Sequence, residues 1–208
     1  MNAKTWALFA LAFAAALLTS ISARAQDAEP ELPYDEVAAF DREFAVAIYG
    51  TGHAGSYFAG GMGGRLRWQP FADDVPFGLE AYVEATVVDW PGEGFRHDYP
   101  NGFNVFVPIR LSQDFRLRGF IGFCDILSFV EPAQEDAPRA DDVLFGIHGG
   151  FGAEWAVHSM FSLFADAQAN VYMGHDRSSE GWTGGVDEEF TFFWNAQLNV
   201  GLQFHLGR

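Results

Sequence analysis

Apolar and polar residues alternate along the last stretch of the chain, residues 192–206. Because successive side chains of a strand point to opposite faces, this period predicts one long strand with an apolar and a polar face. Trp194 and Phe204 lie toward the two ends of the apolar face, ten positions apart. That length and those terminal aromatics suit a strand that crosses a bilayer. The apolar positions are Phe192, Trp194, Ala196, Leu198, Val200, Leu202, Phe204 and Leu206.

Earlier segments show the same two-residue period, and we predict a strand in each. Two of them resemble the last stretch, since residues 58–68, 145–155 and 194–204 all span eleven positions between aromatic residues. Such matched intervals predict two aromatic girdles, formed by Phe58, Trp68, Phe145, Trp155, Trp194 and Phe204. The seven earlier strands are predicted at residues 43–49, 57–68, 77–87, 103–111, 115–123, 144–155 and 163–173.

The predicted connections are short and long in alternation. Residues 69–76, 112–114 and 156–162 are short, and the first connection, 50–56, is also brief. Outer-membrane barrels have short turns at the periplasmic end and longer loops outside. An even number of strands therefore places both termini in the periplasm. The long, polar, acidic connections are residues 89–102, 125–143 and 174–189.

The N-terminal region has the pattern of an export signal. Lys4 precedes an apolar run, residues 6–18, and Ala23-Arg24-Ala25 provides a small-residue cleavage site. We predict a cleaved signal peptide at residues 1–25. Residues 26–41 are acidic and contain two prolines, so we expect a short disordered leader, with a docking tail as the alternative. The barrel domain is then residues 42–208.

The charge of the predicted mature chain excludes one class of partner. After residue 25 there are ten Arg and no Lys against 28 acidic residues, and 10 minus 28 gives −18. Such a chain is not expected to bind nucleic acid. Cys124 is the only cysteine and cannot form an internal disulfide, so we expect a small packed residue.

These features together resemble the small outer-membrane barrels of the OmpA and OmpW kind. The resemblance covers residues 42–208 and rests on pattern. It implies an all-β fold: a closed, antiparallel, eight-stranded transmembrane β-barrel with up-and-down meander topology in the bacterial outer membrane. Implied partners are outer-membrane lipid, lipopolysaccharide and the barrel assembly machinery. One departure is the C-terminus, where Gly207 and Arg208 follow the last strand instead of a terminal aromatic.

Charged residues fall on the face predicted to point inward. An eight-stranded barrel has an interior that side chains alone can fill. Buried guanidinium and carboxylate groups must satisfy one another, so we predict an ion-paired plug, with a charged constriction for ions as the alternative. The predicted lumen cluster is Arg65, Arg67, Glu80, Glu84, Arg110, Arg116, Arg118, Glu154 and Asp166.

Two functions fit such a barrel. One is a non-catalytic structural or surface protein whose extracellular ligand is unknown, and the other is an OmpW-like passive channel for small hydrophobic molecules. His158 and Ser159 are adjacent in a short turn, where they are not expected to form a catalytic pair, so we predict no enzyme activity. The six histidines lack metal-ligand spacing, and no calcium-loop motif occurs, so no metal or cofactor is expected. A soluble lipid-binding barrel, with its apolar face inside, is the remaining alternative.

Overall fold

The structure is a computed structural model that describes residues 39–41, 44–70, 77–89, 94–132, 140–175 and 190–206. The predicted signal peptide, residues 26–38 of the leader and the C-terminal Gly207 and Arg208 lie outside these ranges. Within the described ranges, no helix has the length and hydrophobicity needed to cross a membrane.

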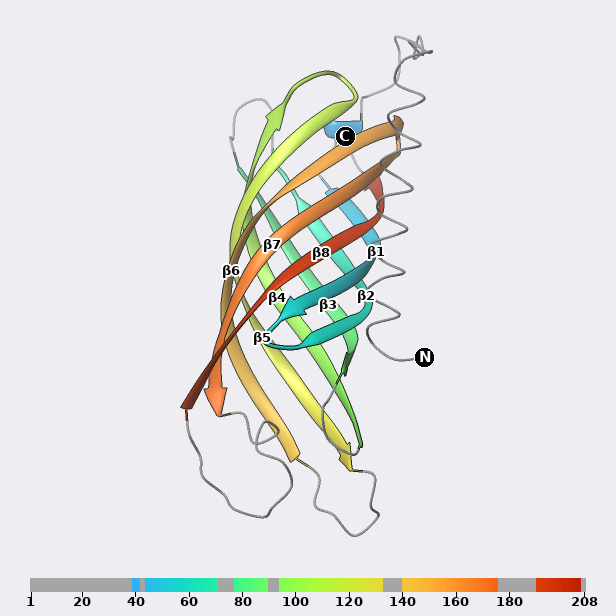
Figure 1. The fold of residues 1–208 in the computed structure, drawn as a ribbon. Helices are drawn as coiled ribbons and strands as arrows, with labels where there is room; N and C mark the ends of the chain where they lie inside the picture. Colours follow the sequence, from blue (N-terminus) through green and yellow to red (C-terminus); the bar gives the residue numbers. More distant parts are fainter. Residues whose placement is uncertain are drawn as a thin grey trace.

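Eight strands follow a short 3-10 turn, η1, at Ala39–Asp41. Each strand pairs antiparallel with the next, and β1 pairs with β8 to close the barrel (Figure 1). The predicted closed meander is therefore confirmed. The strands are β1 Phe44–Gly55, β2 Phe58–Trp68, β3 Gly78–Asp89, β4 Gly94–Arg110, β5 Phe115–Pro132, β6 Ala140–His158, β7 Phe161–His175 and β8 Phe190–Leu206.

The barrel wall is apolar outside and polar inside. Ile121 and Phe151 on the outer face are 68% and 79% exposed, whereas the inward Glu154 and Gln203 are fully buried. A soluble barrel that binds lipid would place its apolar face inside, so the structure contradicts that alternative. This inverted arrangement is the one that a bilayer requires of a closed barrel, whose backbone groups are all paired within the wall.

The strands differ in length around the barrel. β1, β2 and β3 have 11 or 12 residues, whereas β4 to β8 have 15 to 19. About 9–11 residues of a tilted strand suffice to cross a bilayer, so β4 to β8 extend beyond that length. Figure 1 shows the extension at the end away from the C-terminus, where the β1–β2 hairpin stops short.

The prediction of long loops is wrong in two places. Residues 94–102 and 125–132 pair with each other in β4 and β5, and residues 140–143 belong to β6. These parts of the chain lack a clean apolar face, which hid their strand character in the sequence. The backbone ladder needs no apolar face, and inward polar groups satisfy one another: Ser128 Oγ donates to Asp98 Oδ1 at 2.7 Å.

The end of the predicted leader also differs from expectation. Ala39 and Phe40 are buried, and Ala156 of β6 packs against them. The prediction of disorder through residue 41 is therefore wrong for the last three leader residues, because Phe40 finds an apolar contact inside the barrel mouth.

Gly63 on β2 gives room for a contact between the neighbouring strands. It lies in one row between Tyr49 of β1 and Glu84 of β3. The Tyr49 hydroxyl donates to Glu84 Oε1 at 3.0 Å, and its ring occupies the space above Gly63. A Cβ atom at Gly63 would lie 2.5 Å from Cζ of Tyr49. The absence of a side chain at this position thus permits the hydrogen bond across β2.

We expect Gly63→Ala to displace Tyr49 and to lower the free energy of unfolding by about 1–3 kcal/mol, because the added methyl overpacks a filled interior. Urea unfolding of the barrel refolded into lipid vesicles measures this. Gly64→Ala is the matched control, since a Cβ there meets only the Ala47 carbonyl oxygen, at 3.6 Å. Equal stability of the two variants would contradict the role given to Gly63.

Candidate functional site: a charged network in the lumen

Four arginine side chains enter the barrel from two strands. Arg65 and Arg67 are alternate residues of β2, and Arg116 and Arg118 are alternate residues of β5, so each pair shares one strand face. All four are nearly fully buried, at 2–6% exposure. The guanidinium groups meet three carboxylates, which belong to Glu80 of β3, Glu154 of β6 and Asp166 of β7.

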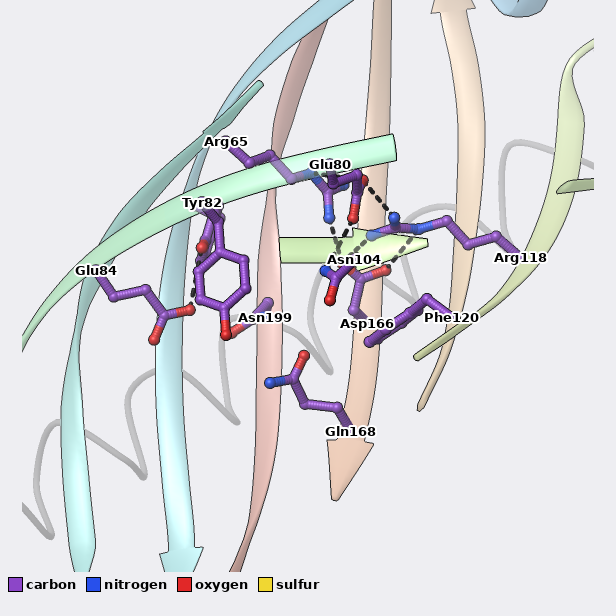
Figure 2. Close-up of a pocket in the computed structure, with 11 residues that line it drawn as sticks. Arg65, Glu80, Tyr82, Glu84, Asn104, Arg118, Phe120, Asp166, Gln168 and Asn199 are labelled. Carbon is purple, nitrogen blue, oxygen red and sulfur yellow. Dashed lines mark hydrogen bonds and ion pairs between the residues drawn. The ribbon is translucent and has the colours of Figure 1, made fainter. Parts of the chain in front are cut away.

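Glu80 contacts three of the four arginines. Its Oε2 atom accepts from Nη2 of Arg67 at 2.8 Å and from Nη1 of Arg118 at 2.5 Å. Nε of Arg65 lies 3.6 Å from the same oxygen. The Asn104 amide donates to the other oxygen at 3.2 Å. Figure 2 shows Glu80 between Arg65 and Arg118, with a dashed line joining Glu80 to Arg118.

Asp166 and Glu154 extend the network across the lumen. Arg118 binds Asp166 with two nitrogens, Nη2 to Oδ2 at 2.5 Å and Nε to Oδ1 at 3.2 Å. Arg65 Nη1 donates to Oδ2 of the same carboxylate at 2.6 Å. Glu154 accepts from Nε of Arg116 at 2.6 Å and also forms ion pairs with Arg67, Arg118 and Arg65. Since β2 and β5 are separated by two strands, these contacts connect distant parts of the wall.

Gly152 of β6 makes the Arg118–Asp166 contact possible. Gly152 pairs with Arg118 on one side and with Asp166 on the other. A Cβ atom at this position would lie 2.8 Å from Arg118 Nε and would overlap Asp166 Oδ1. Like Gly63, this glycine lets side chains of the two adjacent strands meet over it.

Aromatic rings cover the faces of the guanidinium groups. The Arg65 guanidinium carbon lies 3.7 Å from the centre of the Phe164 ring, and that of Arg67 lies 4.7 Å from the centre of Phe106. Such contacts stabilise cations that have lost their water. Neither contact was predicted from the sequence, although an aromatic residue at an inward position near inward arginines, such as Phe106, was a signal that could have indicated it.

Glu84 lies in the lumen but binds neutral donors rather than arginine. It accepts from the Tyr49 hydroxyl at 3.0 Å and from the Gln197 amide at 2.8 Å. His53 Nε2 is 3.5 Å from its other oxygen. The sequence predicted that Glu84 pairs with the arginine cluster. This prediction is wrong, because Glu84 binds Tyr49 and Gln197 instead.

The prediction is wrong for Arg110. This residue ends β4, and its side chain is 40% exposed, with Nη1 2.6 Å from Asp41 Oδ1. Its position in the alternation matched that of the lumen residues, but the wall ends there, so the side chain leaves the barrel mouth. The other eight predicted cluster residues are all buried.

A small cavity separates the arginine network from Glu84. Its volume is about 10 Å³, close to the minimum for one water molecule. Tyr49 contributes to its lining, and so do Tyr82 and Phe120, which Figure 2 labels. Farther along, amides join in a row, with Gln168 donating to Gln197 at 2.8 Å and Asn170 to Asn195 at 2.6 Å. Side chains therefore fill the interior at successive levels.

The predicted girdle residues all lie on the outer face. Phe58, Trp68, Phe145, Trp194 and Phe204 are 36–62% exposed, and Trp155 is half-buried. Their placement at the two boundaries of a bilayer stays a prediction.

Other candidate chemistry is sparse in the described ranges. Ser159 Oγ lies 3.3 Å from Nδ1 of the adjacent His158, in the β6–β7 turn. Among the residues whose placement is described, no three His, Cys, Asp or Glu side chains come together as metal ligands would. Cys124 is buried with Ile126, Leu144 and Tyr172 in an apolar cluster.

No protein-family model and no curated protein matches the sequence. Solved structures do match the fold. Neisserial surface protein A is 13% identical with a TM-score of 0.52, over 78% of this chain and 96% of that chain. OprG, an outer-membrane protein of Pseudomonas aeruginosa, is 9% identical with a TM-score of 0.52, over 84% and 100%. A major outer-membrane protein of Thermus thermophilus is 11% identical with a TM-score of 0.50, over 77% and 99%.

At this level of identity the likeness concerns the fold alone. The chain has the architecture of small eight-stranded outer-membrane barrels, and the resemblance expected from the sequence is confirmed to that extent.

Replacing Glu80 tests the energetic weight of the network. We expect Glu80→Ala to lower the free energy of unfolding by about 3–5 kcal/mol, because Arg65, Arg67 and Arg118 each lose a buried carboxylate partner. Glu84→Gln is the matched control, with an expected loss of about 1 kcal/mol, since an amide oxygen can still accept from Tyr49 and Gln197. Urea unfolding in lipid vesicles measures both. A loss for Glu84→Gln as large as that for Glu80→Ala would contradict the distinction.

Proposed function

We propose that this protein is an integral outer-membrane barrel that neither conducts nor catalyses, and that presents the extended ends of β4 to β8 at the cell surface. The observation that carries the proposal is the arginine–carboxylate network, which links β2, β3, β5, β6 and β7 across the lumen. In this role, strand ends and loops make the contacts outside, and the lumen serves to hold the wall in one shape.

The outer face supports a place in the membrane. Its exposed side chains include large apolar ones, such as Ile121, Phe123 and Phe151. Outer-membrane lipid and lipopolysaccharide would contact this band, and the assembly machinery would insert it. Both the first residue of β1 and the last residue of β8 lie at one mouth, paired as Phe44 and Leu206. We assign this mouth to the periplasm.

Placing an arginine on the outer face tests whether the barrel lies in a membrane. We expect Ile121→Arg to cost about 2–4 kcal/mol of folding free energy in vesicles, because the position lies near the bilayer midplane. Leu111→Arg, just past the end of β4 and 59% exposed, should cost about 0–1 kcal/mol. The measurement is urea unfolding monitored by the mobility difference between heated and unheated samples on gels. Equal costs at both positions, or recovery of the wild type in the soluble periplasmic fraction, would contradict a membrane position.

The contacts of the network support a lumen closed to ions. Moving a charged group out of water costs several kcal/mol, which the tight pairing of Arg118 with Asp166 and Glu80 offsets. The adjoining cavity of about 10 Å³ leaves room for at most one water molecule. An ion crossing the barrel would have to break this pairing.

We expect the wild-type barrel to give no stable single-channel current in planar bilayers, because paired side chains occupy the lumen. The double variant Glu80→Ala with Asp166→Ala removes two of the three carboxylates, and any current it carries should favour anions, since the arginines stay. Glu84→Gln is the control and should stay silent. A steady wild-type conductance would contradict the closed lumen.

The second candidate is a passive path for small hydrophobic molecules. It is favoured by the apolar cluster in the upper lumen, where Tyr82 and Phe193 pack on the buried Cys124, Ile126, Leu144 and Tyr172. These side chains fill the space between them, which weighs toward the closed barrel. Uptake of a small hydrophobic dye into vesicles that contain the wild type would favour the second candidate; uptake equal to that of empty vesicles would favour the first.

A further inference from the structure

The turn η1, which precedes β1, enters the barrel mouth instead of lying beside it. Ala39 and Phe40 are 2% and 3% exposed, although neither belongs to a strand. Ala156, an inward residue near the end of β6, packs against both. In Figure 1 the turn lies at the same end of the barrel as the C-terminus.

The Phe40 ring covers the groups that would otherwise face the mouth. The Arg116 guanidinium carbon lies 4.3 Å from the centre of the ring, and His205 meets the ring edge to face at 5.9 Å. Behind His205, its Nε2 atom contacts Ser162 Oγ at 2.8 Å. Arg116 in turn binds Glu154, so the ring covers the end of the charged network nearest this mouth.

Burial of the ring, more than charge, holds the turn in place. The ion pair between Asp41 and Arg110 is about 40% exposed on both sides. Exposed pairs of this kind contribute little, since water competes for both groups. A buried phenylalanine ring, in contrast, loses its favourable environment as soon as the turn leaves the mouth.

We propose that Ala39–Asp41 form an intramolecular stopper, which seals this mouth of the lumen and can leave it without unfolding the barrel. With the stopper in place, water does not reach Ser162, His205 and Arg116. With the stopper out, these residues are open to solvent, while the arginine network still closes the lumen behind them. This goes beyond the proposed function, because a wall with a paired network would be closed to ions with or without η1.

Thiol labelling of the purified barrel in detergent micelles tests the stopper, since both mouths are then accessible. Ser162→Cys, in a Cys124→Ser background, places a thiol behind the stopper, and a small charged methanethiosulfonate is the reagent. Adding Phe40→Ala should speed labelling of this introduced thiol by at least about tenfold, because labelling a buried group requires local opening. Asp41→Asn should change the rate less than about twofold, as expected for an exposed ion pair.

The native Cys124 is the matched control. It is 3% exposed and lies on β5 beyond Arg118, on the far side of the network from Phe40. Its labelling rate, measured with Ser162 intact, should be the same with and without the Phe40→Ala substitution. A rise at both thiols would mean that Phe40→Ala loosens the whole barrel, and would overturn the proposal.

Equal labelling of the introduced thiol with and without the Phe40 ring would also overturn it. The mobility of unheated samples on gels shows whether each variant is folded. Phe40→Leu keeps apolar bulk but removes the ring, and should give an intermediate rate. If Phe40→Ala does not fold and Phe40→Leu labels at the wild-type rate, Phe40 is needed only for folding and the stopper is excluded.

Discussion

The guanidinium groups of Arg65, Arg67, Arg116 and Arg118 lie together in a lumen too narrow to hydrate them, and the rest of the structure accommodates this constraint. Each buried cation costs several kcal/mol to desolvate, so its carboxylate partners must be close and well oriented. Glu80, Glu154 and Asp166 meet this need from three different strands. Because the arginines come from β2 and β5, the pairing fixes the distance between distant parts of the wall. Charge thus takes the place that a hydrophobic core has in a soluble barrel.

Features that look unrelated in the sequence serve this pairing. Gly152 lets Arg118 reach Asp166 across β6, and Gly63 lets Tyr49 reach Glu84 across β2. At both positions, side chains from the two neighbouring strands meet in the space that a Cβ atom would occupy. Phe106 and Phe164 would be misplaced on a polar face, yet they lie against the guanidinium planes of Arg67 and Arg65. Inward aromatics and glycines are therefore part of how the charges are buried.

Alternation predicted the fold because a closed barrel in lipid must segregate its two faces at every strand. Alternation does not predict the strands beyond the part of the wall where one face must be apolar. The far parts of β4, β5 and β6 lack a clear two-residue apolar period, so their sequence resembles that of loops. Arg110 falls at an alternate position that matches the lumen residues, but alternation does not show where the barrel wall ends.

Pairing within the lumen was only partly predictable. Glu80 and Glu84 share one face of β3, and only the geometry across the barrel decides which of them meets arginine. Phe40 was missed because an isolated aromatic in an acidic leader has no periodicity.

A double-mutant cycle between Arg118 and Asp166 tests most directly whether cross-lumen pairing holds the barrel. Arg118→Met and Asp166→Leu remove each charge singly and then together, and unfolding free energies are measured in the same vesicles. Pairing predicts that the double variant is more stable than the sum of the single losses allows, by about 0.5–3 kcal/mol, the range found for residues in one network. Additive losses, with a coupling energy near zero, would contradict the account, since the two groups would then be stabilised independently.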